Sequence, residues 1–595
     1  MNNQKRENLL NLALDITEEE RRQTVELNVG FDETDGLWEV IVRYAGDITR
    51  YRELGIEVVP LLGGYAILRL DRAMLDMISG IPEIAYIEKP KRLFFSDDRG
   101  RNASCISPLQ LGNVPADINT VPQLYGAGIL VGVADSGIDV LHPAFRNSDG
   151  STRIVRIWDQ TRGATEENPS PFDYRRGAEY TEEQINGLIR AYESGEVTGS
   201  VMPAADSSGH GTAVAGVAAG SALYNTSPEL INARGVAPQS RLVVVKMGIP
   251  GPDSFPRTTE LMMAVDYCVR TSLELGIPIA VNLSIGNTYG AHDGTSLLET
   301  YLDMAADVGR NTIVTGAGNE GAAAGHTSGI LRGSAVENVL LAVAPYETKL
   351  SLQIWKNYED IFGVGLSNPS GASAGPFQSI LGTQEFVLGS TKLLLYYGEP
   401  APYSTAQEIY IEFIPAAEDS YIDSGIWEIR LIPSRVVTGV YNMWLPDSSV
   451  LNLSTRFLRP SAETTLTIPS TAAKVITAGA YNAALSSYSD FSGRGYTRTI
   501  RRVKPDIVAP GVNIFTAAPG GGFTSVSGTS FAAPSVTGAA ALLMEWGIVN
   551  GNDLFLYGEK VKAYLIRGAR ALPGFEEFPN PSVGYGALCV KDSLP

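Results

Sequence analysis

Three short segments hold the residue types that a nucleophilic serine site requires. Asp135 lies in the turn ADSGID, His210 in DSSGHGTAVAG, and Ser530 in SGTSFAAPSVTGAAALL. A serine hydroxyl is a weak nucleophile at neutral pH and needs a positioned base, and that base needs a carboxylate to hold its tautomer. We therefore interpret Ser530 as the nucleophile, His210 as the general base and Asp135 as the residue that orients it.

The elements that must position these residues form an alternating pattern over residues 107–325. Short apolar runs, each ending in small residues, alternate with helical segments; the runs are GILVGVADSG, RLVVVKMG, IPIAVNLSIG and RNTIVTGAGN. This order predicts parallel strands joined by crossover helices, hence an α/β fold with a doubly wound sheet. Sites in such sheets assemble where strands end and the next helices begin, so the three segments can converge there.

Two further regions differ from this pattern. Residues 37–93 read as strands and helices of a small α+β domain, and residues 340–465 as short alternating strands without a strong helix, which is typical of an all-β sandwich of jelly-roll type. The α/β pattern returns near residue 474. The predicted domains are therefore 1–100, the first catalytic part 101–340, the inserted jelly roll 341–465, and the second catalytic part 466–595.

The order Asp, His, Ser and the surrounding residues resemble the subtilisin-like serine proteases (subtilases). The matched segments are DSGID, GHGTAVAG and GTSFAAP, and GAGNEG matches the oxyanion segment of the family. The resemblance implies a serine endopeptidase with Asp135, His210 and Ser530 as the triad. It also implies that Asn319 and the backbone N–H of Ser530 stabilise the oxyanion of the tetrahedral intermediate.

The resemblance extends to the substrate-binding residues. It implies that Ser284, Ile285 and Gly286 form an edge strand that pairs with the substrate backbone. It also implies that one wall of the primary specificity pocket consists of Gly316, Ala317 and Gly318. For Glu320 two interpretations stay open: a carboxylate at the pocket mouth that favours a basic side chain, or a solvated surface acid.

The resemblance also gives residues 1–100 a role. Subtilases commonly carry an α+β propeptide that assists folding and inhibits the enzyme through its C-terminal tail. The charged, small-residue stretch SDDRGRNAS follows the α+β region, so we expect autoproteolytic cleavage between residues 91 and 104, with the freed propeptide staying bound as an inhibitor.

The architecture looks most like the clostridial spore-germination subtilases, the Csp proteases. That likeness implies packaging in spores and activation of a cortex-degrading zymogen by limited proteolysis. Some members of that group lack an intact triad, so the alternative is a catalytically silent binding partner that retains its propeptide. The intact triad and Asn319 favour the active enzyme.

The composition limits the classes of molecule that we expect the protein to bind. A net charge of −19 opposes binding to nucleic acid and to anionic lipid, and no apolar run approaches the ~18 residues that span a bilayer. The first residues are polar and charged, which predicts synthesis in the cytoplasm without a classical signal peptide. The expected partner is a protein or peptide substrate, and the residues do not determine the oligomeric state.

No residue pattern indicates a cofactor or a metal. The four histidines lack zinc-ligand spacing, and the loop LYNTSPELINARG after the His210 segment lacks the ligand pattern of a calcium site. The three cysteines lie far apart, at 105, 268 and 589, so we expect free thiols. In the β region the aromatic residues either pack in the core, which we favour, or stack on sugars; they are Trp355, Tyr396, Tyr397 and Tyr403.

Overall fold

The structure is a computed structural model of the chain. It describes residues 5–6, 8–15, 30–32, 35–61, 64–89, 103–110, 123–172, 174–221, 234–248, 256–380, 383–400, 404–417 and 419–595. The chain divides into two compact units, Met1–Phe95 and Ser96–Pro595. The predicted cleavage window, 91–104, lies outside the described residues except for its last two positions.

The first unit is an antiparallel sheet with helices, as the α+β pattern predicts. Its strands are β1 (Phe31–Asp32), β2 (Leu37–Tyr44), β3 (Glu57–Leu61), β4 (Tyr65–Leu70) and β5 (Ile84–Glu88), and its helices are α1 (Asn8–Asp15) and α3 (Arg72–Ser79). The sheet has the order β1-β2-β4-β3, and β5 also pairs with β2, along residues 41–44. Strand β2 alternates buried and exposed residues, because one face of the sheet covers the core that contains Trp38 and Val40.

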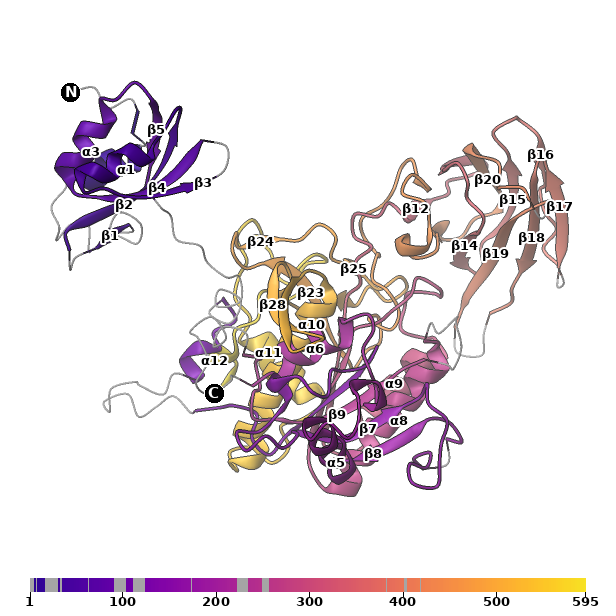
Figure 1. Cartoon of the computed structure of the whole chain (residues 1–595). Coiled ribbons are helices and arrows are strands. Elements are labelled where there is room, and N and C mark those ends of the chain that lie inside the picture. The colour runs from indigo at the N-terminus through magenta and orange to yellow at the C-terminus, as the bar shows by residue number, and fades with distance from the viewer. Residues whose placement is uncertain are drawn as a thin grey trace. The chain divides into compact units, whose positions relative to one another are not determined.

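The second unit contains the predicted doubly wound sheet (Figure 1). Its order is β24-β23-β11-β10-β6-β9-β7-β8, with β27 also paired to β23. The parallel strands are β6 (Leu130–Asp135), β7 (Ile154–Asp159), β9 (Arg241–Lys246), β10 (Ile279–Leu283), β11 (Asn311–Gly316), β23 (Ile476–Asn482) and β27 (Ile507–Pro510). Strands β8 (Ala178–Thr181) and β24 (Ser487–Tyr488) are antiparallel to their neighbours. Two small hairpins accompany this sheet: β25 (Gly495–Tyr496) with β26 (Val503–Lys504), and β28 (Ile514–Ala518) with β29 (Gly522–Val526).

Helices cover the central sheet on two sides, each with its own apolar core. The helices are α5 (Glu182–Glu193), α6 (His210–Ala219), α8 (Thr258–Leu275), α9 (Leu297–Ala305), α10 (Thr529–Met544), α11 (Glu559–Arg567) and α12 (Val590–Ser593). Helices α6 and α10 pack in one core, and α8 and α9 in the other. Since α6 and α10 are buried nearly all round, their sequences are small and apolar without an amphipathic stripe.

Among the described residues, one helical stretch, Thr529–Val549, is long and apolar enough to cross a membrane by length and composition. However, 89% of its most apolar window is buried inside the protein. The stretch contains α10, so its apolar character follows from its place in the core.

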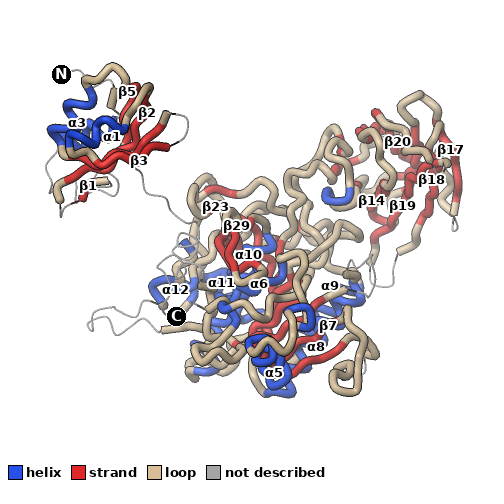
Figure 2. Tube along the Cα trace, viewed as in Figure 1, coloured by secondary structure: helices blue, strands red, loops and turns tan. Residues whose placement is uncertain are grey.

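Between β11 and β23 the chain forms two antiparallel sheets (strands in red, Figure 2). One contains β12 (His326–Ile330), β21 (Val440–Trp444), β14 (Leu350–Asn357), β19 (Ala406–Pro415), β18 (Thr391–Tyr397) and β17 (Gln384–Leu388). The other contains β16 (Ser373–Ala374), β15 (Ile361–Ser367), β20 (Gly425–Arg435), β13 (Glu337–Val343) and β22 (Arg456–Phe457). Their inner faces share one apolar core, so this β insert is a sandwich. Its strands begin at residue 326; the jelly-roll type and the predicted boundaries stay predictions.

The expectation of three free cysteines is wrong for two of them. Cys105 and Cys589 form a disulfide, and Cys268 is free and buried in the core. The pair is 484 residues apart in sequence, and the fold brings the two together where Val590 N donates a hydrogen bond of 2.9 Å to Ser104 O. Such a distant pairing leaves no mark in the spacing of cysteines.

Candidate active site

The structure brings Asp135 and His210 together at the end of the central strand β6. Asp135 is the last residue of that strand and His210 the first of α6, and Asp135 Oδ1 lies 2.7 Å from His210 Nδ1. Gly211 allows this approach, because a Cβ there would lie 2.2 Å from the carbonyl oxygen of Gly137. Steric exclusion therefore explains why a glycine follows His210 in the GHG segment. The contact with Asp135 holds the imidazole at Nδ1, as the base of a triad requires.

A second carboxylate, Asp206, fixes the start of the same helix. Its Oδ2 accepts hydrogen bonds from Thr212 N (2.8 Å) and Thr212 Oγ1 (2.7 Å), and its Oδ1 accepts from Gly209 N (2.9 Å). Asp206 Oδ1 also accepts from Ser136 Oγ, at 2.8 Å, next to Asp135. Asp206 thus caps α6 and connects it to the Asp135 turn. It was not among the residues predicted from the sequence, although an acid four positions before the histidine is a visible signal.

The surroundings of His210 shift its pKa. Burial by itself lowers this pKa, but the charge and hydrogen bond of Asp135, with a smaller contribution from the charge of Asp206, raise it above the usual value. Asp135 is itself buried, so little solvent screens its charge. A base whose pKa is raised in this way is well suited to accept a proton near neutral pH.

Ser530 lies in the first turn of α10. Gly528 precedes this helix with a φ of 147°, a backbone conformation that favours glycine. Ser530 Oγ lies 3.4 Å from the carbonyl oxygen of Ser284, and the ring of the next residue, Phe531, lies 5.4 Å from the His210 ring. The hydrogen bonds of the described residues do not include one from Ser530 to His210; catalytic hydrogen bonds are often long before substrate binds.

Asn319 and the start of α10 make a pair of hydrogen-bond donors. Asn319 Oδ1 accepts from Thr529 N (3.0 Å) and from Thr529 Oγ1 (3.2 Å), which orients the side-chain amide. A Cβ placed on Gly528 would lie 3.6 Å from Asn319 Nδ2 and 3.7 Å from Ser530 N, so both nitrogens flank one space. Two N–H donors at a helix N-terminus provide what a developing oxyanion needs.

Two adjoining cavities include these residues. The smaller, of about 200 Å³, is lined by Ser530 and Asn319 together with Gly316, Gly318, Thr467 and Thr529. The larger, a cleft of about 1000 Å³, contains Asp135, His210 and apolar side chains such as Leu261 and Leu298. Ser284, Ile285 and Gly286 line both.

One of the three predicted wall residues, Ala317, does not line the smaller cavity. Ala317 is fully buried, its N–H donates to Ala478 O (2.9 Å), and its carbonyl accepts from Thr467 N (3.1 Å). The pairing of residues 284–286 with a substrate backbone stays a prediction.

The structure excludes one of the two interpretations of Glu320. Its side chain is only 7% exposed and lines the smaller cavity with Asp447. Ser448 donates to it twice, from Oγ at 2.8 Å and from N at 3.2 Å. Glu320 is therefore not a solvated surface acid. Asp447 and Ser448 come from the segment that follows β21 of the β insert, and no sequence signal pointed to them.

The other histidines have structural roles. His142 Nδ1 accepts from Ala144 N at 3.0 Å and its Nε2 contacts Gly522 O at 2.8 Å. His292 and His326 both stack on the ring of Trp444, at centroid distances of 4.2 and 4.7 Å. Burial lowers the pKa of each of these two to about 4, so they are neutral at physiological pH. The stack joins the catalytic domain to the β insert.

No metal site is visible in the part of the chain that the structure describes. No group of three or more His, Cys, Asp or Glu side chains there could hold a metal ion. The loop LYNTSPELINARG after α6, residues 223–235, lies outside the described residues except for Arg234 and Gly235. Independence from metals stays a prediction.

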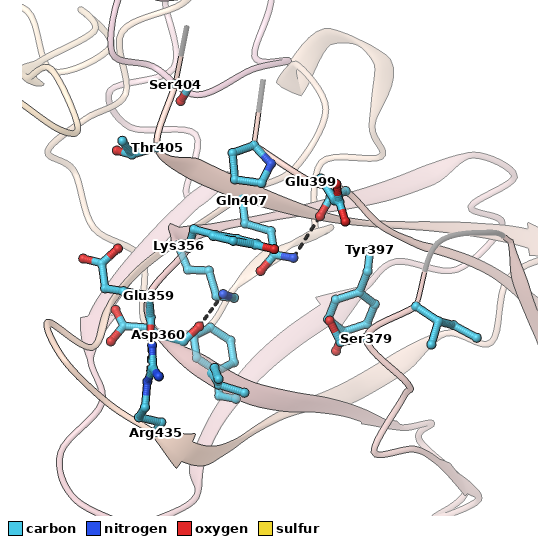
Figure 3. A pocket seen from close by; sticks show the side chains of 16 residues that line it. Lys356, Glu359, Asp360, Ser379, Tyr397, Glu399, Ser404, Thr405, Gln407 and Arg435 are labelled. Carbon is cyan, nitrogen blue, oxygen red and sulfur yellow. Dashed lines mark hydrogen bonds between the residues drawn. The ribbon is translucent and has the colours of Figure 1, made fainter. Parts of the chain in front are cut away.

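A separate cavity of about 720 Å³ lies in the β insert (Figure 3). It is lined by Lys356, Tyr397 and Gln407, among others; Lys356 Nζ bonds to Asp360 O, and Gln407 Nε2 donates to Gly398 O at 2.8 Å. Of the four aromatic residues that could stack on sugars, Tyr397 lines this cavity, and it is also buried in the sandwich core. Tyr403 lies outside the described residues. Core packing thus accounts for Tyr397.

Comparison with known proteins identifies the family to which the chain belongs. A profile of the subtilase family matches residues 126–401 and 452–586. The chain belongs to the subtilase family. A profile of the Csp protease B prodomain matches residues 4–91. These matches confirm the two-part prediction of a subtilase with a propeptide.

The relatives fit the same assignment. The CspB protease of Clostridium perfringens, whose structure is solved, is 36% identical, with a TM-score of 0.73, over 83% of this chain and 96% of that one. The minor extracellular protease Vpr of Bacillus subtilis is 23% identical over 79% of this chain, and a C5a peptidase of Streptococcus pyogenes is 23% identical over 80%. The chain spans about half the length of these curated relatives, 52% and 41%.

Proposed function

We propose that this subtilase is an active serine endopeptidase with Asp135, His210 and Ser530 as its triad and Asn319 as an oxyanion donor. The observation that carries the proposal is the 2.7 Å contact between Asp135 and His210 in the larger cleft, next to the smaller cavity that Ser530 and Asn319 line. In the reaction Ser530 Oγ attacks the scissile carbonyl while His210 takes its proton. His210 then returns the proton to the leaving amine, and water hydrolyses the acyl-enzyme.

The proposal includes one self-cleavage and then limited proteolysis of another protein. The match to a Csp protease B prodomain and the likeness to a CspB protease support removal of the first domain by the enzyme itself. We include in the proposal that the substrate is the zymogen of a spore-cortex lytic enzyme and that the protein is packaged in spores. Both parts derive from the Csp resemblance alone.

A fluorophosphonate probe tests the catalytic part, because it reacts only with an activated serine. Purified full chain should be labelled at Ser530 and should release a fragment of roughly 100 residues, as expected of a prodomain cut at an exposed linker. The Ser530→Ala variant should stay full-length and unlabelled. A folded wild-type chain that neither labels nor processes itself would instead be the catalytically silent binding partner. A cortex-lytic zymogen left uncut by the labelled enzyme would remove only the substrate part.

A further inference from the structure

The smaller cavity beside Ser530 contains two carboxylates from different parts of the chain. Glu320 directly follows Asn319, whereas Asp447 arrives from the β insert, after β21. The same cavity contains Gly316, Gly318 and Ser530, so it is continuous with the reacting serine. With about 200 Å³ it holds several times the ~30 Å³ of one water molecule, enough for a long side chain.

The two acids contact each other, and the other hydrogen bonds that they accept bring no positive charge to the cavity. Glu320 accepts from Ser448 Oγ and N, and Asp447 Oδ1 accepts from Ser449 N (3.0 Å) and Ser449 Oγ (2.6 Å). All of these donors are neutral. Among the residues that the structure describes, no Lys or Arg is within ion-pair distance of either acid. Buried or half-buried carboxylates without a cation are costly, and they favour a ligand that supplies one.

The electrostatics agree with this geometry. Burial and the neighbouring charge of Asp447 raise the pKa of Glu320 to about 7. A cation placed between the two acids would favour the ionised form of Glu320 and remove their mutual repulsion. An anionic or purely apolar side chain would gain nothing from them.

We infer that the primary specificity pocket of this subtilase takes a basic residue, lysine or arginine, and that Asp447 of the β insert is a specificity-determining residue together with Glu320. The inference rests on the proposed function and names its substrate class. It gives the β insert a direct part in substrate selection. It also predicts self-cleavage after one of the basic residues of the window, which are Lys91, Arg92, Arg99 and Arg101.

The test is a series of otherwise identical peptides that carry Arg, Lys, Gln, Leu or Glu before the scissile bond. For self-processed wild-type enzyme, kcat/KM for Arg and Lys should exceed that for Gln by ~10-fold or more, as expected when a site's buried charges are left unpaired by the wrong substrate. Asp447→Asn and Glu320→Gln should each reduce the Arg/Gln ratio by ~3-fold or more. Asp419→Asn changes the same charge on an exposed loop of the β insert and should leave the ratio unchanged.

The possible failures are distinguishable. Fluorophosphonate labelling of Ser530 together with equal cleavage after Arg and Gln would overturn this inference and leave the proposed function intact. A basic preference that survives in both Asp447→Asn and Glu320→Gln would show that other residues determine it. An unlabelled Ser530 with every peptide uncut would overturn both proposals.

Discussion

At the scale of single residues, the pH dependence of the enzyme should follow His210. In the proposed mechanism catalysis needs neutral His210. Asp135 and Asp206 raise its pKa, so kcat/KM should fall as the pH drops through a value above the usual 6.5. Asp206→Asn removes one raising charge, and the acidic limb should move to lower pH. The measurement is the midpoint of the limb in a kcat/KM profile. An unchanged midpoint would mean that Asp206 acts only as a helix cap.

Glu320 should make stability depend on pH in a predictable direction. Its pKa is about 7 in the folded protein against 4.5 ordinarily, so folding binds a proton between these values. The contribution of Glu320 to the free energy of unfolding is therefore lost as the pH rises from 4.5 through 7.

Replacing Glu320 by Gln should remove this loss. At pH 8 the variant should unfold with a free energy higher by about 1–3 kcal/mol, and at about pH 4.5 the gain should vanish. Denaturant titrations at the two pH values measure this, with Asp419→Asn as the surface control. A gain of the same size at both pH values would rule out the buried charge as its cause.

At the scale of elements, the close packing around the buried helices α6 and α10 leaves no room for a side chain at Gly538. A Cβ on Gly538 of α10 would lie 2.5 Å from Val236 Cβ and 2.8 Å from Ala218 O. Gly538→Ala should therefore destabilise the protein by about 1–3 kcal/mol through overpacking. Because the proposed nucleophile, Ser530, lies in the first turn of α10, the variant should label more slowly with the fluorophosphonate probe.

Gly187 serves as the control for Gly538, because it lies on a helix surface with free space around it. Gly187 of α5 has no atom within 4 Å of the position that a Cβ would take, so Gly187→Ala should stabilise the fold by about 0.5–1 kcal/mol through helix propensity. Thermal or denaturant unfolding of both variants measures the contrast. Equal effects at the two positions would show that the helix packing is looser than the contacts indicate.

The β insert is the element whose role changed most between sequence and structure. Its strand pattern predicts a sandwich, and the structure shows it fixed to the catalytic domain by hydrogen bonds from Thr288 Oγ1 to Leu445 O (2.9 Å) and from Gln353 Nε2 to Thr288 O (3.2 Å). The same junction places Asp447 in the lining of the cavity that contains Ser530. An insertion that packs this closely can change substrate selection as well as stability.

At the scale of the whole molecule, the expected self-cleavage should be intramolecular. A tail already held at the site reacts without a second encounter, so the rate of fragment release should not depend on protein concentration. Mass spectrometry during refolding should give a cut between residues 91 and 104. Release that accelerates with concentration, or a mature N-terminus far outside this window, would contradict the propeptide interpretation.

Metal removal is the second test on the whole molecule. The described residues contain no cluster of metal ligands, and we predict that EDTA changes neither the melting temperature nor the activity. A fall of several degrees that calcium restores would reveal a site in the remaining residues.

The fold class and the proposed catalytic residues can be read from the amino-acid sequence alone. Strand patterns such as GILVGVAD are local, and the triad segments carry local steric demands, such as the glycine after His210 that lies against Gly137. Short-range periodicity and short-range packing are both encoded within a few neighbouring residues, so they are visible without knowledge of the rest of the chain.

The contacts between distant segments, in contrast, emerge only from the folded chain. The Cys105–Cys589 disulfide, the link from Asp206 to Ser136 and the meeting of Glu320 with Asp447 each join residues whose spacing carries no periodic signal. Such contacts depend on how strands cross and where an insertion packs back, and long-range packing fixes both. For the same reason the sequence suggests Glu320 as a pocket carboxylate but gives no sign of Asp447, which reaches the same cavity only through the packing of the β insert.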